Sequence, residues 1–111
     1  MTYHDTYFGA AKFIGEEIVY KNSKPVWGMN YYGFVSDNDI SEDKLDTILR
    51  SALMSGSGDN IPVRGPKYFI GGSGKYTFNV NGDLTNFTGI EEIFENNKII
   101  YRLFCHGGLL G

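Results

Sequence analysis

Hydrophobic and polar residues alternate along most of the chain, which is the period of β-strands that bury one face. The alternation predicts three strands in the first third, over residues 2–8, 13–20 and 26–35. Three more are predicted in the last third, over residues 76–80, 86–95 and 98–105, with an additional short strand over 67–70. Asn22 and Ser23 separate two apolar runs and predict a hairpin turn. Pro25 stands where a strand can begin without donating a ladder hydrogen bond.

A helical period occurs once, in the middle of the chain. Its apolar positions follow the i, i+3, i+4, i+7, i+8 spacing of a single stripe: Leu45, Ile48, Leu49, Ala52 and Leu53. Ser41 is a suitable N-cap, and Gly56 is a suitable residue after the last turn. We therefore predict one main helix over about 41–55, packed on a mainly antiparallel sheet. The expected fold is α+β, in the order βββ-α-βββ.

The two strand-rich parts resemble each other when the sequence is shifted by 74 residues. Identical residues then coincide at several pairs of positions, among them 13 and 87, 15 and 89, 17 and 91, 22 and 96, and 33 and 107. This predicts an internal duplication, with repeats over about 1–35 and 74–109 of a single domain, 1–111. The alternative is that two unrelated β-hairpins look alike because both alternate and both turn on Asn.

Composition and charge narrow the functional classes. The formal net charge is −3 and no block of Lys or Arg occurs, which argues against direct binding of nucleic acid. The single cysteine, Cys105, excludes an internal disulfide and favours a reducing compartment. The N-terminus does not resemble a signal peptide, and no apolar run approaches a membrane span. We therefore predict a cytoplasmic protein that contacts no membrane.

Several motifs extend over nearly the whole chain and resemble a known signature. They are Asp5-x-Tyr7-Phe8-Gly9, Phe13-x-Gly15-Glu16-Glu17, Pro25-Val26-Trp27-x-Met29-Asn30-Tyr31-Tyr32-Gly33, Arg64-Gly65-Pro66, Phe87-x-Gly89 with Glu91-Glu92-Ile93, and His106-Gly107-Gly108. The chain resembles a small bacterial family, an uncharacterised domain found alone or C-terminal to a helix-turn-helix of the lambda-repressor type. The resemblance implies a fold but no activity. It also implies a helix before the first strand, and we expect that segment to be missing from this sequence.

Three sequence features suggest chemistry that the surrounding residues do not support. The run from Gly71 to Lys75 lacks the spacing of a phosphate-binding loop, so a hairpin loop is expected there. Cys105 and His106 are neighbours in a predicted strand and therefore point to opposite faces, which places the cysteine in the core. With His4 as the only other histidine, the chain matches no metal-ligand spacing, and we predict neither a metal nor a cofactor.

The predicted sheet carries apolar residues on both faces, although one helix can cover only one of them. The second face includes Tyr32, Phe34, Ile100 and Phe104. Apolar surface of that extent is unusual on a monomer, so a second chain, a ligand or the absent N-terminal helix is expected to cover it. We predict a homodimer.

These observations favour a protein of unknown function that acts as a non-catalytic domain binding a small ligand or a partner in a sensory role. A small-molecule site is expected beside the third strand and its repeat partner, lined by Trp27, Asn30, Tyr32, Arg102 and His106, with Glu17 at its rim. Alternation places Trp27 on the opposite face from Asn30. Two alternatives remain: a small enzyme that uses Glu17 or Glu91 with His106 or Tyr32 as acid–base groups, and a structural dimerisation domain.

Overall fold

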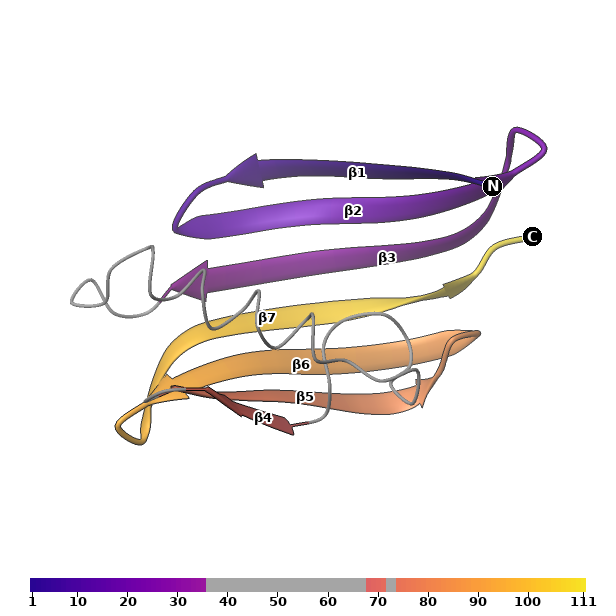
Figure 1. Cartoon of the computed structure of the whole chain (residues 1–111). Coiled ribbons are helices and arrows are strands. Elements are labelled where there is room, and N and C mark those ends of the chain that lie inside the picture. The colour runs from indigo at the N-terminus through magenta and orange to yellow at the C-terminus, as the bar shows by residue number, and fades with distance from the viewer. Residues whose placement is uncertain (36–67, 72–73) are drawn as a thin grey trace.

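The protein forms one antiparallel sheet of seven strands in the order β1-β2-β3-β7-β6-β5-β4 (Figure 1). The computed structural model describes residues 1–35, 68–71 and 74–111. The strands are β1 (Thr2–Gly9), β2 (Lys12–Lys21), β3 (Lys24–Val35), β4 (Tyr68–Gly71), β5 (Gly74–Asp83), β6 (Asn86–Glu95) and β7 (Lys98–Leu109). Both chain termini lie at the same end of the sheet (Figure 1). All seven predicted strands are confirmed, and several extend beyond their predicted ends.

The expectation of an α+β fold is wrong for the described residues, which contain strands and turns but no helix. The described fold is all-β because each of its segments alternates with the period of two that a sheet requires. The helix predicted over residues 41–55 lies outside the described residues. Within the described ranges, no helix is long and apolar enough to cross a membrane.

Two hairpins occupy equivalent places in the two halves of the sheet. Asn22 and Ser23 have φ angles of 53° and 63°, and Asn96 and Asn97 have φ angles of 51° and 62°. Positive φ at both central residues is typical of the type I′ turn, whose twist matches that of the flanking strands. A register shift follows each turn, between Val19 and Tyr20 in one hairpin and between residues 93 and 94 in the other. Both the turns and the shifts are 74 residues apart.

The two halves meet at the pairing of β3 with β7, where Tyr31 lies opposite Cys105. These two residues are themselves related by the shift of 74, since 31 + 74 = 105. A residue that pairs with its own equivalent lies on a local two-fold axis. The axis passes between Tyr31 and Cys105, perpendicular to the sheet, and places β1–β2–β3 opposite β5–β6–β7.

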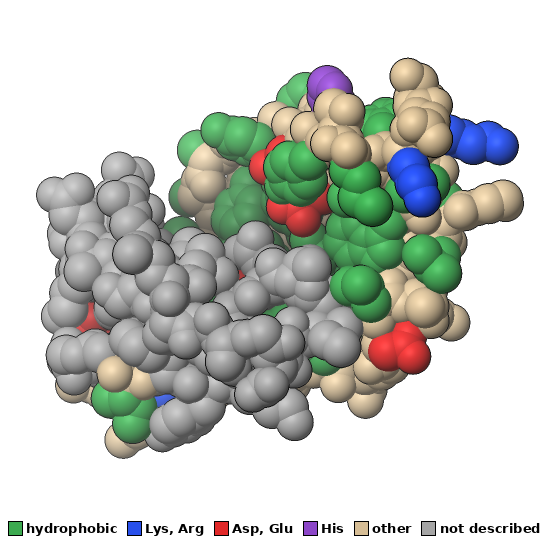
Figure 2. Space-filling view, turned by 45° about the vertical axis from the view of Figure 1, so that its right-hand side comes forward, with side chains coloured by type: hydrophobic (Ala, Val, Ile, Leu, Met, Phe, Trp, Pro, Cys, Tyr) green, Lys and Arg blue, Asp and Glu red, His purple; other side chains and the backbone are tan. Residues whose placement is uncertain are grey.

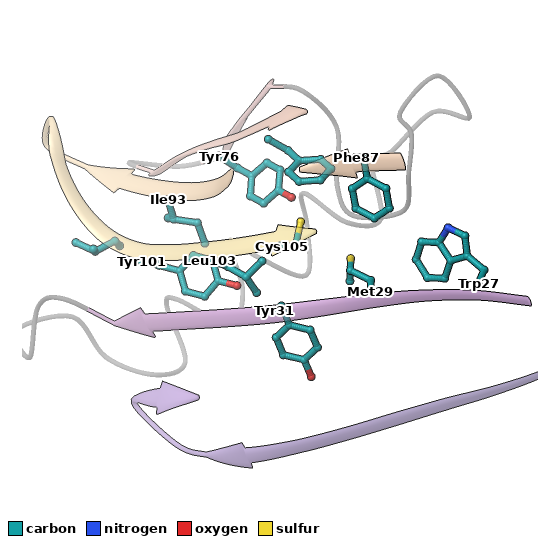
Figure 3. Packing of buried hydrophobic residues seen from close by; sticks show 11 residues of the cluster. Trp27, Met29, Tyr31, Tyr76, Phe87, Ile93, Tyr101, Leu103 and Cys105 are labelled. Carbon is teal, nitrogen blue, oxygen red and sulfur yellow. The ribbon is translucent and has the colours of Figure 1, made fainter. Parts of the chain in front are cut away.

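The core lies on one face of this sheet, which we call the core face. Its buried members come from β3, β5, β6 and β7: Trp27, Met29, Tyr31, Tyr76, Phe78, Phe87, Ile93, Ile100, Tyr101, Leu103 and Cys105 (Figure 3). The rings of Trp27 and Phe87 stack with their centroids 5.8 Å apart. Burial of each large side chain contributes about 2–3 kcal/mol of hydrophobic stabilisation. The predicted core position of Cys105 is confirmed.

Large hydrophobic side chains also remain at the surface. Figure 2 shows one side of the molecule, on which hydrophobic and acidic side chains lie next to each other. Among the aromatic residues whose burial the structure describes, the most exposed belong to β1, where Tyr7 and Phe8 are 64% and 69% exposed. Every residue of β1 is exposed. Hydrophobic packing is therefore concentrated in the second half of the sheet.

Candidate functional site

The face of the sheet opposite the core face, which we call the open face, carries side chains in rows that run across the strands. Strand register places Thr6, Glu16, Asn30, His106, Thr88 and Asn81 directly opposite one another, from β1 to β5. We call this set the polar row. Neighbouring side chains in such a row lie about 4.5–5.5 Å apart at Cβ. Six strands thus present an unbroken line of hydrogen-bonding groups.

A groove of about 630 Å³ lies along the middle of the polar row. Four polar-row residues line it, namely Glu16, Asn30, His106 and Thr88. Apolar side chains of Ile18 and Leu110 complete part of its wall. Its volume falls in the range of about 300–1,000 Å³ found for small-molecule sites.

Glycines form the floor of the groove, where β3 pairs with β7 at Gly28 and Gly108. A Cβ atom on Gly28 would lie 2.9 Å from Ile18 Cδ1, at the end of a flexible side chain. A Cβ atom on Gly108 would instead meet the backbone carbonyl of Thr85, in the turn between β5 and β6. Glycine at these positions lets the Ile18 side chain and the Thr85 backbone lie close against the floor of the groove.

Three polar side chains of the groove have no hydrogen-bonding partner in the part of the chain that the structure describes. Glu16, Asn30 and His106 are exposed, and within that part their side chains form no hydrogen bond or ion pair. They combine a carboxylate, an amide that both donates and accepts, and an imidazole. A bound molecule would find acceptors and donors on three adjacent strands, over about 10 Å.

Of the six residues predicted for the site, Asn30 and His106 line the groove. Tyr32 lies on the same face, one row from Asn30 in the direction away from the chain termini (Figure 1). Arg102 also lies on the open face, but it pairs across the sheet with Phe34, two rows from His106. Its guanidinium donates to the Glu92 carboxylate, with Nη2 at 2.6 Å and Nε at 2.8 Å. The structure therefore brings Asn30 and His106 together and holds Arg102 away from them.

Trp27 and Glu17 lie on the core face, away from the groove. The Trp27 indole is buried and donates to the Leu84 carbonyl oxygen at 2.8 Å. The Glu17 carboxylate accepts a hydrogen bond of 2.6 Å from the Tyr3 hydroxyl. Burial raises the pKa of Tyr3 above its ordinary value, and the hydrogen bond to Glu17 raises it further. Neither Trp27 nor Glu17 contacts the polar row.

The carboxylate in the groove is that of Glu16, which the sequence-based prediction missed. The reason is the register shift after the hairpin turn. Near the turn, Tyr20 pairs with Pro25, but Val19 pairs with Trp27, so Val26 is an extra residue in β3. Such a bulge exchanges the faces of all residues beyond it. The one sequence feature that could have pointed to Glu16 is the pair of adjacent glutamates. Adjacent residues of a strand place one carboxylate on each face, whatever the register.

The acid–base pairs considered for an enzyme are separated by the sheet. Glu17 and Glu91 point to the core face, whereas His106 and Tyr32 point to the open face. Glu91 is fully buried and accepts hydrogen bonds from the hydroxyls of Tyr76 and Tyr101. Among the described residues, no group of three or more His, Cys, Asp or Glu could hold a metal ion.

Comparison with protein-family models gives a match to a domain of unknown function (DUF5680) over residues 5–110. The match covers nearly the whole chain and agrees with the resemblance noted from the sequence motifs. Comparison with curated proteins and with solved structures found no match.

Proposed function

The chain belongs to the family described as a domain of unknown function (DUF5680), and we propose that it is a non-catalytic domain that binds a small polar molecule in the groove of its open face. One observation carries this proposal. Glu16, Asn30 and His106 lie opposite one another on three adjacent strands, beside a floor of glycines. Convergent polar groups in a concave surface are what small-molecule sites use to orient a ligand.

The spacing within the polar row favours binding over acid–base catalysis. Glu16 and His106 are separated by Asn30, so two strand spacings, about 10 Å, lie between them. A carboxylate that orients an imidazole must come within about 2.6–3.2 Å of it. Cys105, the one thiol, is buried on the opposite face. Among the described residues, the groove therefore has groups that can hold a molecule, but no paired groups that would activate one.

The groove also favours a particular shape of ligand. Its glycine floor accepts a flat or narrow group that rests on the backbone, and the polar row supplies hydrogen bonds along one side. Ile18 and Leu110 offer apolar contact on the other side. A small molecule with one polar edge and one apolar edge fits this arrangement. A sensory role coupled to a helix-turn-helix region stays a prediction from the resemblance.

The test is a fragment screen by two-dimensional ¹H–¹⁵N NMR with a mixed library of small amides, diols, amines and carboxylates. We expect binders to shift the amides of residues 28–30, 86–88 and 106–108. Asn30→Ala and His106→Ala should each weaken binding about fivefold or more, since loss of one hydrogen bond typically removes about 1 kcal/mol. Gly28→Ala should also weaken binding, because its methyl group would occupy the floor of the groove.

Asn79→Ala is the matched control for Asn30→Ala. Asn79 is exposed on the same face but pairs with Ile90, away from the groove. The control should bind every fragment as the parent does. If no fragment shifts the groove amides at millimolar concentration, or if Asn30→Ala and His106→Ala both bind as tightly as the parent, the proposal is wrong.

A further inference from the structure

Next to the polar row, the open face carries a second line of side chains that is entirely apolar across five strands. Strand register places its members directly opposite one another: Phe8, Ile14, Tyr32, Phe104 and Ile90. We call this set the apolar row. Its members are between 38% and 69% exposed. With strands about 4.8 Å apart, the row is about 19 Å long.

A continuous line of exposed large hydrophobic side chains needs an explanation, whereas isolated ones do not. The apolar row differs from scattered exposure because each member lies directly opposite the next across the sheet. Five strands about 4.8 Å apart and about nine residues long present roughly 700 Å² of face. Stable protein–protein interfaces cover about 600–1,000 Å² on each partner. The open face is therefore large enough to form one.

We propose that a second copy of this chain packs face to face on the open face, related by a two-fold axis that runs along the apolar row. Sheets that pack this way lie about 10 Å apart with their strands within about 30° of alignment. Under this symmetry each strand lies over the same strand of the second copy, in the opposite direction. The apolar rows of the two copies then cover each other.

The charges beside the apolar row are complementary under this symmetry. Along β2, Lys12, Ile14 and Glu16 follow one another on the open face, so opposite charges flank an apolar residue. Rotation about the row places Lys12 of one copy over Glu16 of the second, and Glu16 over Lys12. Within the described part of the chain, neither side chain forms an ion pair. Two equivalent ion pairs therefore form at once.

The other strands add no like-charge contact. Along β3, Phe34 lies over Asn30 of the second copy. Along β7, Arg102 lies over His106 of the second copy, but its charge is already neutralised by Glu92 at 2.6 Å. This self-complementarity favours a second copy over an unrelated partner, because a lone helix or strand would satisfy only one of the two flanks.

A two-fold axis parallel to the strands makes a different prediction. It would place β2 over β7 of the second copy, so that Lys12 would face Arg102, which Glu92 already neutralises, and Glu16 would face His106. The two arrangements therefore differ in the partner of Lys12. In the proposed one, reversing both charges on β2 restores the ion pairs between copies. In the other, it does not.

The inference goes beyond the proposed ligand site, although the two surfaces adjoin. Glu16, Asn30 and His106 lie in the row next to the apolar row, so the second copy would cover these polar groups of the groove. The glycine floor lies one row further from the axis, towards the end of the sheet at which both termini lie (Figure 1). Ligand binding and self-association would therefore compete for these groups, and each has its own readout: the chemical shifts of the groove amides for the ligand and sedimentation for the dimer.

The test is sedimentation velocity on the full chain between about 1 and 100 µM. We expect a dimer of twice 12.4 kDa, or 24.8 kDa. Lys12→Glu and Glu16→Lys should each raise the dissociation constant about tenfold or more, because each change replaces two attractions with two repulsions. The double variant Lys12→Glu/Glu16→Lys should return to within about threefold of the parent.

Contacts within one copy cannot produce this restoration. Lys12 and Glu16 are four residues apart on one strand, about 13 Å, which exceeds the screening length of about 8 Å at physiological salt. Lys24→Glu is the matched control, because Lys24 is exposed at the hairpin end of β3. It should dimerise as the parent does. Phe104→Ser should give a folded monomer, as judged by circular dichroism.

Three results would overturn the inference. The first is a parent chain that sediments at 12.4 kDa over the whole range. The second is a dimer that Phe104→Ser leaves intact, which would place the interface elsewhere. The third is a double charge variant that dissociates as readily as the single variants, which would exclude this two-fold axis. Failure of the fragment screen would leave these outcomes unchanged.

Discussion

The Tyr101 hydroxyl donates a hydrogen bond of 2.7 Å to the carboxylate of Glu91, which is fully buried in the core face. Tyr76 donates a second hydrogen bond to the same carboxylate from the neighbouring strand β5. A buried carboxylate without such partners would destabilise the fold strongly. The two tyrosines explain why a glutamate occurs in the middle of an aromatic core.

Replacing Tyr101 with Phe should lower the free energy of unfolding by about 1–3 kcal/mol, because one hydrogen bond to a buried acceptor is lost without a change in ring packing. Urea denaturation followed by fluorescence would measure it. Tyr3→Phe is the matched control, since Tyr3 bonds to Glu17, the equivalent of Glu91 in the first half, at an exposed site. Its effect should stay below about 1 kcal/mol. Equal losses for the two variants would contradict the role given to burial.

Tyr3 should make stability sensitive to alkaline pH. Burial and the neighbouring Glu17 raise the pKa of Tyr3 in the folded chain above the ordinary value of 10.0. The folded state therefore keeps a proton that the unfolded state loses. The stabilisation that the protonated Tyr3 hydroxyl gives to the folded state is fully present below about pH 10. It is lost as the pH rises towards the pKa of Tyr3 in the folded chain. The stability difference between the parent and Tyr3→Phe should shrink from pH 9 to pH 11. A difference that grows over this range would show the sign to be wrong.

Gly82 should not tolerate a side chain. Its φ angle is 94°, outside the range that other residues adopt, and a Cβ atom there would meet the backbone carbonyl of Asn86. Gly82→Ala should therefore lower the melting temperature by well over 5 °C, from a loss of about 2 kcal/mol or more. Gly28→Ala is the comparison, because only the flexible end of Ile18 must move there. It should change the melting temperature far less.

The turn between β2 and β3 should become more stable with glycine at its second position. Ser23 has a φ angle of 63°, which costs a residue with a Cβ atom about 1 kcal/mol relative to Gly. Ser23→Gly should raise the free energy of unfolding by about 0.5–1 kcal/mol. Asn97→Gly, at the equivalent turn, should do the same. Destabilisation by both variants would rule out the type I′ geometry.

Local sequence signals were sufficient for much of the fold. Strict alternation identified the strands, because a sheet with one buried face requires a period of two. Asn22 and Asn96 marked the two hairpin turns, because Asn tolerates the positive φ that a type I′ turn requires. Alternation also placed Asn30, Tyr32 and His106 on one face, as the structure has them. The α+β expectation was wrong for the described residues, which form strands and turns, whereas the helical pattern at 41–55 lies outside them.

Only the tertiary structure decided which of these residues meet. The sequence of a strand indicates on which face a side chain lies, but not which residue lies opposite it. The register between β3 and β7 places Arg102 two rows from His106. The extra residue Val26 decides that Glu16, rather than Glu17, faces the groove. Both the position of Arg102 and the choice of Glu16 depend on strand register, which is set by pairing between segments that are distant in the sequence. The sequence by itself therefore determined the strands, the turns and the alternation of faces, whereas strand register alone assembled the polar row, the apolar row and the glycine floor.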